Sequence, residues 1–387
     1  MAAGWPTKAN YATGDVLSAT NMNDLSGTVN YIDPTSATDG QVLTRDAASA
    51  GKVKWATAGS SGSSQIAGKN AVINGDFLIN QRAFTSNTTT GAYNFDRWLQ
   101  QNSGGTFTVT PQTFTPGTAP IATYEGRTYV QGITATQSAV GHYAILTQRI
   151  EDVTRYAGTT VTISFFAKAN TGTPKIGVEL WQDYGTGGSP STAGTVAQSS
   201  VTLTTSWARY SVSVAVPSLT GKTLGTTANT SYLELNLWTS AGSTYNTRAS
   251  SIGIQNFTAS IWGVQLEYAS AATYFTTATG TLQGELAACQ RYYQALGGQS
   301  IGVFEALNSY DGMWSLLTAM RTTPSISYTG TITGYGVASG NNPVTAVSLK
   351  SGNTVNQLVI ACTGPTGAAG TGTFTSGTGA ILANSEL

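Results

Sequence analysis

Residues 232–238 read Tyr-Leu-Glu-Leu-Asn-Leu-Trp, and the three leucines alternate with polar and aromatic residues. A period of two places one set of side chains on the buried face of a β-strand and the other set on the opposite face. The same alternation recurs in 161–167, 176–181 and 207–216, with Gly-, Ser- and Pro-rich turns between these segments. Several short strands of this kind are typical of an antiparallel β-sandwich. We therefore predict one mainly β domain, a jelly roll, over residues 66–278.

The composition favours an ordered, β-rich chain with few charges. Of the 387 residues only 9% are charged, against roughly 25% in typical soluble proteins, and the formal net charge is zero. Aromatic residues make up 10% and hydrophobic residues 40% of the chain, which argues against disorder. Because there is no basic excess, nucleic acid is not expected as a partner. Because no apolar run approaches about 20 residues, membrane insertion is not expected.

The sequence before the sandwich predicts a separate N-terminal part. Residues 15–25 favour a short helix with Ser18 as its N-cap, and 39–44 and 52–55 favour two strands around a turn. The run Ala-Gly-Ser-Ser-Gly-Ser-Ser at 58–64 has the composition of a flexible linker, which indicates a domain boundary.

After the sandwich, residues 279–298 break the alternation and predict a connecting helix. Four side chains fall at i, i+4, i+7 and i+11 and so form one helical stripe: Leu282, Leu286, Cys289 and Tyr293. Thr281 is the expected N-cap, and Gly297-Gly298 is the expected end. From 299 to 387 strand patterns and Gly-rich turns return, which predicts a C-terminal β domain.

Few residues in this chain can carry metal or nucleophilic chemistry. His142 is the single histidine, so a metal site of several histidines is excluded; it lies in a strand-like stretch and is expected to be structural. Cys289 and Cys362 are expected to be free thiols, since one pair makes no disulfide framework. The sequence contains neither a Gly-x-Ser-x-Gly elbow nor a phosphate-binding Gly-Lys-Thr loop. We therefore expect a protein that is not an enzyme.

Polysaccharide hydrolysis stays open as an alternative, because a glycosidase needs only two carboxylates. The candidate acids are Glu151, Asp152, Glu179, Asp183, Glu234 and Glu267. Any chain of this length offers such pairs by chance, so the sequence alone does not select one.

Sugar binding has a clearer basis in the sequence, since sugars stack their C–H faces on aromatic rings. Trp181, Trp238 and Tyr232 alternate out of phase with the aliphatic residues of their strands, so their rings are predicted on the outward face. Hydrogen-bonding groups follow nearby in Gln182, Asp183 and Asn236. The predicted glycan-binding residues are Trp181, Asp183, Tyr184, Trp238 and Tyr245. The alternative is that a neighbouring subunit covers these aromatic side chains.

Four motifs bracket the sandwich. Two motifs lie near its start, Asn-Gly-Asp-Phe-Leu-Ile-Asn-Gln-Arg at 74–82 and Phe-Asp-Arg-Trp at 95–98. Two lie near and just after its end, Ile-Trp-Gly-Val-Gln-Leu-Glu-Tyr at 261–268 and Ala-Cys-Gln-Arg-Tyr-Tyr at 288–293. In this order they resemble bacteriophage tail-fibre and minor virion proteins that carry a jelly-roll domain like a carbohydrate-binding module. The resemblance implies that residues 1–65 form an N-terminal virion-attachment segment and linker.

The same resemblance implies a tail fibre or receptor-binding protein that contacts host cell-surface glycan during adsorption. It implies a homotrimer located in the virion, at the phage tail or particle surface, and joined to other virion proteins through the N-terminus. One alternative is a structural virion subunit without a receptor, such as a head fibre, a capsid-decoration protein or a tail collar. A polysaccharide hydrolase is the second alternative.

No cofactor is expected apart from a structural calcium ion, which the resemblance implies near the first strand. Asp76 is the expected ligand, because calcium takes carboxylate and carbonyl oxygens. The same residues also fit a turn without metal, since Asn74-Gly75 favours positive φ and Asp76 supports the bend. Asp96-Arg97-Trp98 is expected to form a structural ion pair and an anchor in the core.

Overall fold

A computed structural model describes residues 41–45, 53–57, 68–122, 124–306, 309–336, 339–364 and 370–387. The chain divides into two compact units, 1–64 and 65–387. In the first unit, β1 (Gln41–Arg45) and β2 (Val53–Thr57) pair antiparallel, as the sequence predicts for this region. The helix predicted at 15–25 with Ser18 as its cap, and the linker predicted at 58–64, lie outside the described residues.

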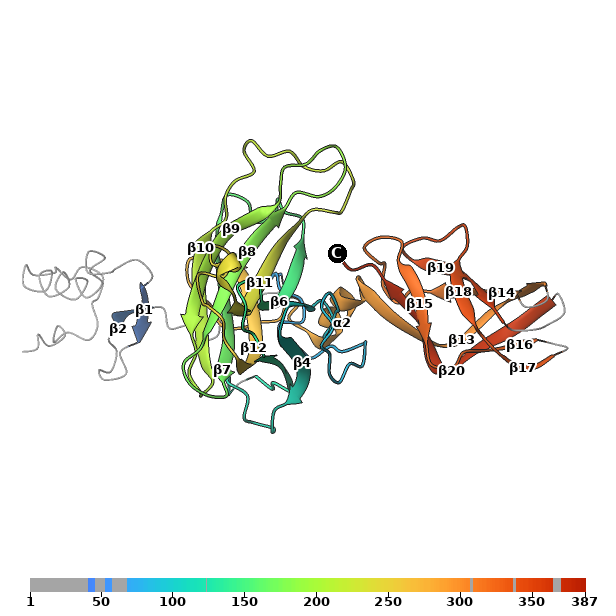
Figure 1. Ribbon diagram of the computed structural model, residues 1–387. Coiled ribbons are helices and arrows are strands. Elements are labelled where there is room, and N and C mark those ends of the chain that lie inside the picture. The colour runs from blue at the N-terminus through green and yellow to red at the C-terminus, as the bar shows by residue number, and fades with distance from the viewer. Residues whose placement is uncertain are drawn as a thin grey trace, which may run out of the picture. The chain divides into compact units, whose positions relative to one another are not determined.

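The sandwich consists of two antiparallel five-stranded sheets (Figure 1). The first sheet has the order β10 (Ala208–Ala215), β7 (Thr160–Ala169), β12 (Phe257–Tyr268), β5 (Thr128–Ala135) and β4 (Thr106–Thr113). The second sheet has the order β3 (Leu99–Ser103), β6 (Tyr143–Glu151), β11 (Tyr232–Ala241), β8 (Lys175–Asp183) and β9 (Gly194–Thr202). Because the chain passes from one sheet to the other at most connections, the domain has the character of a jelly roll. The predicted fold class is confirmed.

The alternating pattern that predicted the strands also fills the core between the sheets. Leu233, Leu235 and Leu237 of β11 are at most 1% exposed, and they share one hydrophobic cluster with Ile163 and Phe165 of β7. Each such side chain contributes about 1.5–3 kcal/mol when it is fully buried. The aliphatic face of each strand is therefore what holds the two sheets together.

The connecting helix α2 (Leu282–Gln290) begins as predicted, because Thr281 Oγ1 accepts a hydrogen bond from the Gly284 amide at 3.1 Å. The predicted end and the predicted apolar stripe are wrong. The helix ends at Gln290, and Leu282 is 53% exposed. The reason is that Tyr292 and Tyr293 leave the helix to join the polar network described below. In the described part of the chain, no helix has both the length and the apolar character of a membrane span.

A second sheet system follows the helix. Its strands are β13 (Tyr293–Ala306), β14 (Ser309–Ser315), β15 (Ser325–Thr329), β16 (Thr333–Gly336), β17 (Ser339–Pro343), β18 (Ala346–Leu349), β19 (Gln357–Thr363) and β20 (Gly370–Asn384). They pair in the order β17-β16-β20-β13-β14-β19-β18, with β15 also on β20, around a separate core that includes Tyr310, Leu358 and Ile360. Cys289 and Cys362 are both buried free thiols, as expected.

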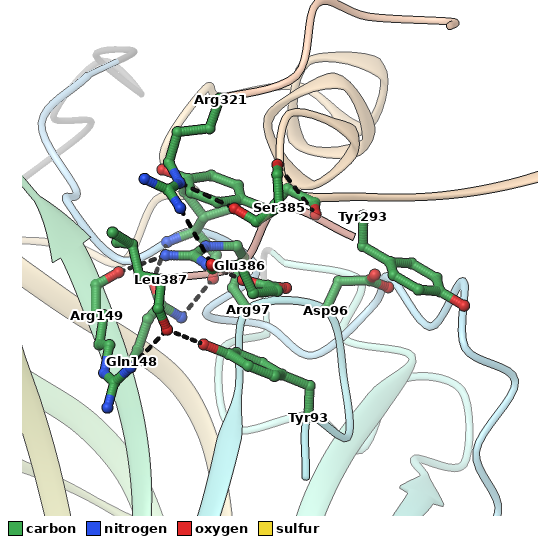
Figure 2. A network of polar contacts seen from close by, with 12 residues as sticks. Tyr93, Asp96, Arg97, Gln148, Arg149, Tyr293, Arg321, Ser385, Glu386 and Leu387 are labelled. Carbon is green, nitrogen blue, oxygen red and sulfur yellow. Dashed lines mark hydrogen bonds and ion pairs between the residues drawn. The ribbon is translucent and has the colours of Figure 1, made fainter. Parts of the chain in front are cut away.

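A buried network of arginines joins the sandwich to this C-terminal domain (Figure 2). Arg97 is 1% exposed, forms an ion pair with Glu386 and lies 3.4 Å from the centroid of the Tyr292 ring. Arg82 donates to Glu386 at 3.1 Å and to Asp96 at 3.0 Å. The expected structural role of Asp96 and Arg97 holds, but the two residues pair with other partners and not with each other.

The last residues of the sequence run through this network. The Ser385 amide donates to the Tyr292 carbonyl at 2.8 Å, and Arg321 donates to the carbonyls of Ser385 at 2.9 Å and Glu386 at 3.1 Å. Tyr93 donates to the Leu387 carbonyl at 3.0 Å. Residues from motifs at the start and at the end of the sandwich therefore meet at one place. There they connect the sandwich to the C-terminal domain.

Asp96 gives this junction a dependence on pH. Burial raises its pKa from 3.8 to about 6, although Arg82 acts in the opposite direction. A carboxyl whose pKa is raised by folding stabilises the folded state most below pH 4, and that contribution is lost as the pH rises through 6. In Asp96→Asn this titration is absent. We expect the stability of the wild type relative to Asp96→Asn to increase by up to about 1.4 kcal/mol for each pH unit between 6 and 4. Urea unfolding at several pH values measures this difference, and a difference that is independent of pH contradicts it.

Candidate functional site

The outward face of the second sheet carries a lattice of polar and aromatic side chains. Strand register sets three neighbouring rows across β6, β11 and β8: Arg149, Glu234 and Trp181; Thr147, Asn236 and Glu179; Glu151, Tyr232 and Asp183. Residues directly opposite one another on antiparallel strands project to the same face. We use the term polar–aromatic face for Arg149, Glu179, Trp181, Asp183, Tyr232, Glu234 and Asn236 together with Arg248.

Asn236 organises the centre of the polar–aromatic face. Its side-chain oxygen accepts from Thr147 Oγ1 at 2.6 Å, and its nitrogen donates to Glu179 at 3.1 Å and to Glu234 at 2.9 Å. Asn236 is fully buried, so an unpaired amide there would be costly. The bond from Thr147 orients the amide, and the other two bonds fix the positions of both carboxylates.

Arg248 lies over this lattice and comes from the segment that follows a short 3₁₀ helix, η2 (Ser243–Tyr245). Its Nε and Nη2 donate to the two oxygens of Glu179 at 2.8 and 3.1 Å, a bidentate geometry. The guanidinium carbon is 4.4 Å from the centroid of the Trp181 ring. A cation at this distance from an indole ring stabilises the position of both groups.

The prediction that Trp238 faces outward to solvent is wrong. Its side chain leaves the leucine face of β11 as predicted, but it is fully buried. Tyr143, Tyr245 and Arg248 cover it, and its Nε1 donates to Glu179 at 2.9 Å. Because the segment after η2 folds over this end of the sheet, no face of the Trp238 ring is available to a sugar.

The other predicted glycan-binding residues differ in how far their side chains are exposed. Tyr184 is 3% exposed and donates to the side chain of Gln182, which is itself buried, so neither offers a surface group. Trp181 and Asp183 are half-buried on the polar–aromatic face, and the Gly185 amide donates to Asp183 at 2.9 Å. Tyr245 is half-buried against Trp238. The structure thus brings Trp181 and Asp183 onto one surface with Tyr232.

Apart from Asp183, the charged members of the face were not predicted as glycan-binding residues. Glu179 and Glu234 stand out of phase with the aliphatic residues of β8 and β11, a signal present in the sequence. Arg149 pairs with Glu234 at 2.9 Å from the adjacent strand. Arg248 carries no local signal at all, since only the folding of its loop brings it to Glu179.

Asp76 lies in the turn that the sequence offered as the alternative to a metal ligand. Asn74 has φ 57°, and the Phe77 amide donates to its carbonyl at 3.1 Å. Asp76 is 5% exposed; Tyr124 donates to its Oδ2 at 2.7 Å, and its Oδ1 has no hydrogen-bond partner among the described residues. Burial raises the pKa of this carboxyl.

A cavity of about 80 Å³ adjoins Asp76 and Glu285. The oxygens of Glu285 accept from the amides of Asn74 at 2.8 Å and Thr279 at 2.7 Å. Calcium takes six to eight oxygen ligands, and the described residues contain no group of three or more acidic, cysteine or histidine side chains suited to a metal. Asp76 Oδ1 is therefore an unpaired carboxylate oxygen beside this cavity, and calcium at Asp76 stays a prediction.

His142 holds two turns together, in line with the structural role expected for it. Its Nδ1 accepts from the amides of Gly105 and Ser138, both at 3.2 Å. An imidazole nitrogen that accepts two backbone amides is occupied by structural contacts.

No family model and no curated protein matches this chain. Among solved structures, the enzymatically active domain of tailspike protein 4 from bacteriophage CBA120 is 17% identical over 52% of this chain, with a TM-score of 0.31; the matched part is 21% of that tailspike chain. A putative sugar-binding protein from Bacteroides thetaiotaomicron is 14% identical over 52% of this chain and 100% of its own, with a TM-score of 0.35.

The CBM22-2 xylan-binding domain from Paenibacillus barcinonensis is 16% identical over 46% of this chain and 94% of its own, with a TM-score of 0.28. These identities are all below 25% and the TM-scores are all below 0.5. At these values the similarities do not indicate a function for this chain.

Proposed function

We propose that this chain binds glycan through the polar–aromatic face and does not catalyse a reaction. The observation that carries the proposal is a half-buried Trp181 ring beside two partly exposed polar groups that hydrogen bonds already fix. These are the Arg248 guanidinium, which Glu179 holds, and the Asp183 carboxylate, which accepts from the Gly185 amide. An indole ring offers a flat apolar surface for the C–H face of a sugar. Polar groups that are ordered before binding lose little further freedom when they bind hydroxyl groups.

The geometry of the carboxylates supports binding without hydrolysis. Glu179 and Glu234 are two acids of this face that the Asn236 amide bridges. A glycosidase needs one carboxyl to reach the glycosidic oxygen and a second to act on the other side of the sugar ring. Glu179 has no exposed surface and is held by Arg248, so it cannot approach a substrate in this conformation.

We place this binding activity in a virion, in a tail fibre or receptor-binding protein that contacts host surface glycan. The order of the motifs around the sandwich supports this role. Residues 1–65 are the proposed segment that attaches the protein to other virion proteins. In a homotrimer, three weak glycan sites act together and give a higher overall affinity than any one site. A structural virion subunit remains the second candidate, in which the polar–aromatic face packs against a neighbouring protein.

One experiment separates these functions. Purified protein is applied to immobilised bacterial surface polysaccharides, and bound protein and released reducing ends are measured together. We expect saturable binding and no reducing ends above the level of buffer alone. Release of reducing ends assigns a hydrolase instead. Absence of binding by folded protein favours the structural virion subunit.

A further inference from the structure

We propose that residues Ser385–Leu387 act as a lock that makes the sandwich and the C-terminal β domain unfold as one cooperative unit. This inference is independent of glycan binding. The tail lock is defined here as Glu386, the carbonyls of Ser385 and Leu387, and the arginines that contact them: Arg82, Arg97, Arg149 and Arg321.

The hydrophobic cores by themselves do not couple the two domains. One cluster lies between the sheets of the sandwich and includes Phe165 and Leu235. Another lies within the C-terminal domain and includes Tyr310 and Ile360. Within the described residues, no hydrophobic cluster contains side chains from both cores. Two domains that bury separate cores move and unfold independently unless other contacts join them.

The tail lock supplies those contacts. Arg82 and Arg97 extend from the sandwich to the Glu386 carboxylate. Arg149 of β6 donates to the Leu387 carbonyl, and Figure 2 shows Arg97 and Arg149 beside Glu386 and Leu387. Arg321, from the C-terminal domain, donates to the Asn229 carbonyl of the sandwich at 2.6 Å. Arginines of the sandwich therefore contact the C-terminal domain, and an arginine of the C-terminal domain contacts the sandwich.

Aromatic rings hold two of these arginines in place. The Arg97 guanidinium lies 3.4 Å from the centroid of Tyr292, and that of Arg82 lies 3.8 Å from the centroid of Tyr293. Tyr292 lies between α2 and β13, and Tyr293 is the first residue of β13. A guanidinium stacked on a ring is restricted in orientation, so the same tyrosines that end the helix also aim the arginines at Glu386.

Burial makes Glu386 the residue on which the lock depends. The side chains of Arg97 and Glu386 are 1% and 4% exposed. Burial works against the charge of Arg97, but the pairing with Glu386 outweighs it and raises the pKa of the guanidinium. When one partner of such a pair is removed, the other is left as an uncompensated buried charge, which is strongly unfavourable.

Differential scanning calorimetry of Glu386→Gln tests the proposal. The substitution keeps the size of the side chain and removes its charge. We expect one transition for the wild type and two for Glu386→Gln, with the C-terminal domain unfolding roughly 5–10 °C below the sandwich. Glu125→Gln is the matched control, because Glu125 pairs with Arg127 at 3.5 Å and both side chains are well exposed; one transition at the wild-type temperature is expected.

Arg82→Gln is a second variant in case Glu386→Gln does not fold. It removes one contact to Glu386 and the contact to Asp96, and it leaves the pair of Glu386 with Arg97 intact, so a smaller separation of the two transitions is expected. Two independent transitions in the wild type overturn the proposal. A single transition at the wild-type temperature in both variants also overturns it.

Discussion

Gly75→Ala is expected to lower the free energy of unfolding by about 3 kcal/mol or more. A Cβ atom at position 75 lies 2.1 Å from the Val264 carbonyl oxygen, and that contact is with backbone, which cannot rotate away. The Val264 amide also donates to the Gly75 carbonyl at 2.9 Å. Relief of the clash therefore separates the 74–82 segment from β12. Overpacking of this kind costs about 1–3 kcal/mol, and more where the backbone has to move.

Gly141→Ala is the matched control for this effect. A Cβ at Gly141 has no atom within 4 Å, and its φ lies outside the left-handed region. Thermal unfolding followed by circular dichroism is expected to show a loss of roughly 6 °C or more for Gly75→Ala and almost no change for Gly141→Ala. Equal melting temperatures for the two variants show that the first segment is not packed against β12 in solution.

The strands of the sandwich were predictable because their information is local. A stretch of seven residues is enough to identify the buried face of β11, which carries Leu233, Leu235 and Leu237. The period of two can be recognised without knowing which strand lies beside it. The helix after the sandwich shows the limit of such patterns. Tyr293 fits the helical stripe as well as Leu286 does, yet it starts β13, since contacts of Tyr292 and Tyr293 with the arginine network outweigh local helical preference.

The candidate site was predictable only in part, for the same physical reason. The alternation correctly separates Trp181 and Trp238 from the core face of their strands. It contains no information about what covers that face, and the segment after η2 buries Trp238 while it leaves Trp181 half-exposed. The pair of Arg97 and Glu386 is 289 residues apart in the sequence. No local pattern relates two residues at that separation, so only the fold identifies them as partners.

Trp181→Ala is expected to weaken glycan binding about 30-fold or more. Truncation of a central tryptophan in a binding surface commonly costs 2 kcal/mol or more, and each 1.4 kcal/mol is a tenfold change in affinity. The substitution removes the one half-exposed indole ring of the polar–aromatic face and also the surface on which Arg248 rests at 4.4 Å. Isothermal titration calorimetry with a polysaccharide that binds the wild type measures the change.

Trp207→Ala is the control that separates a site effect from a general loss of aromatic surface. Trp207 is also half-buried, packs against Phe114 and Tyr129 and belongs to the cluster around Trp262 on the first sheet. Binding by this variant is expected to match the wild type, while Trp181→Phe, which keeps a ring beside Arg248, is expected to fall between the wild type and Trp181→Ala. If folded Trp181→Ala binds as tightly as the wild type, the polar–aromatic face is not the glycan site. If Trp207→Ala alone loses binding, the site belongs on the opposite sheet.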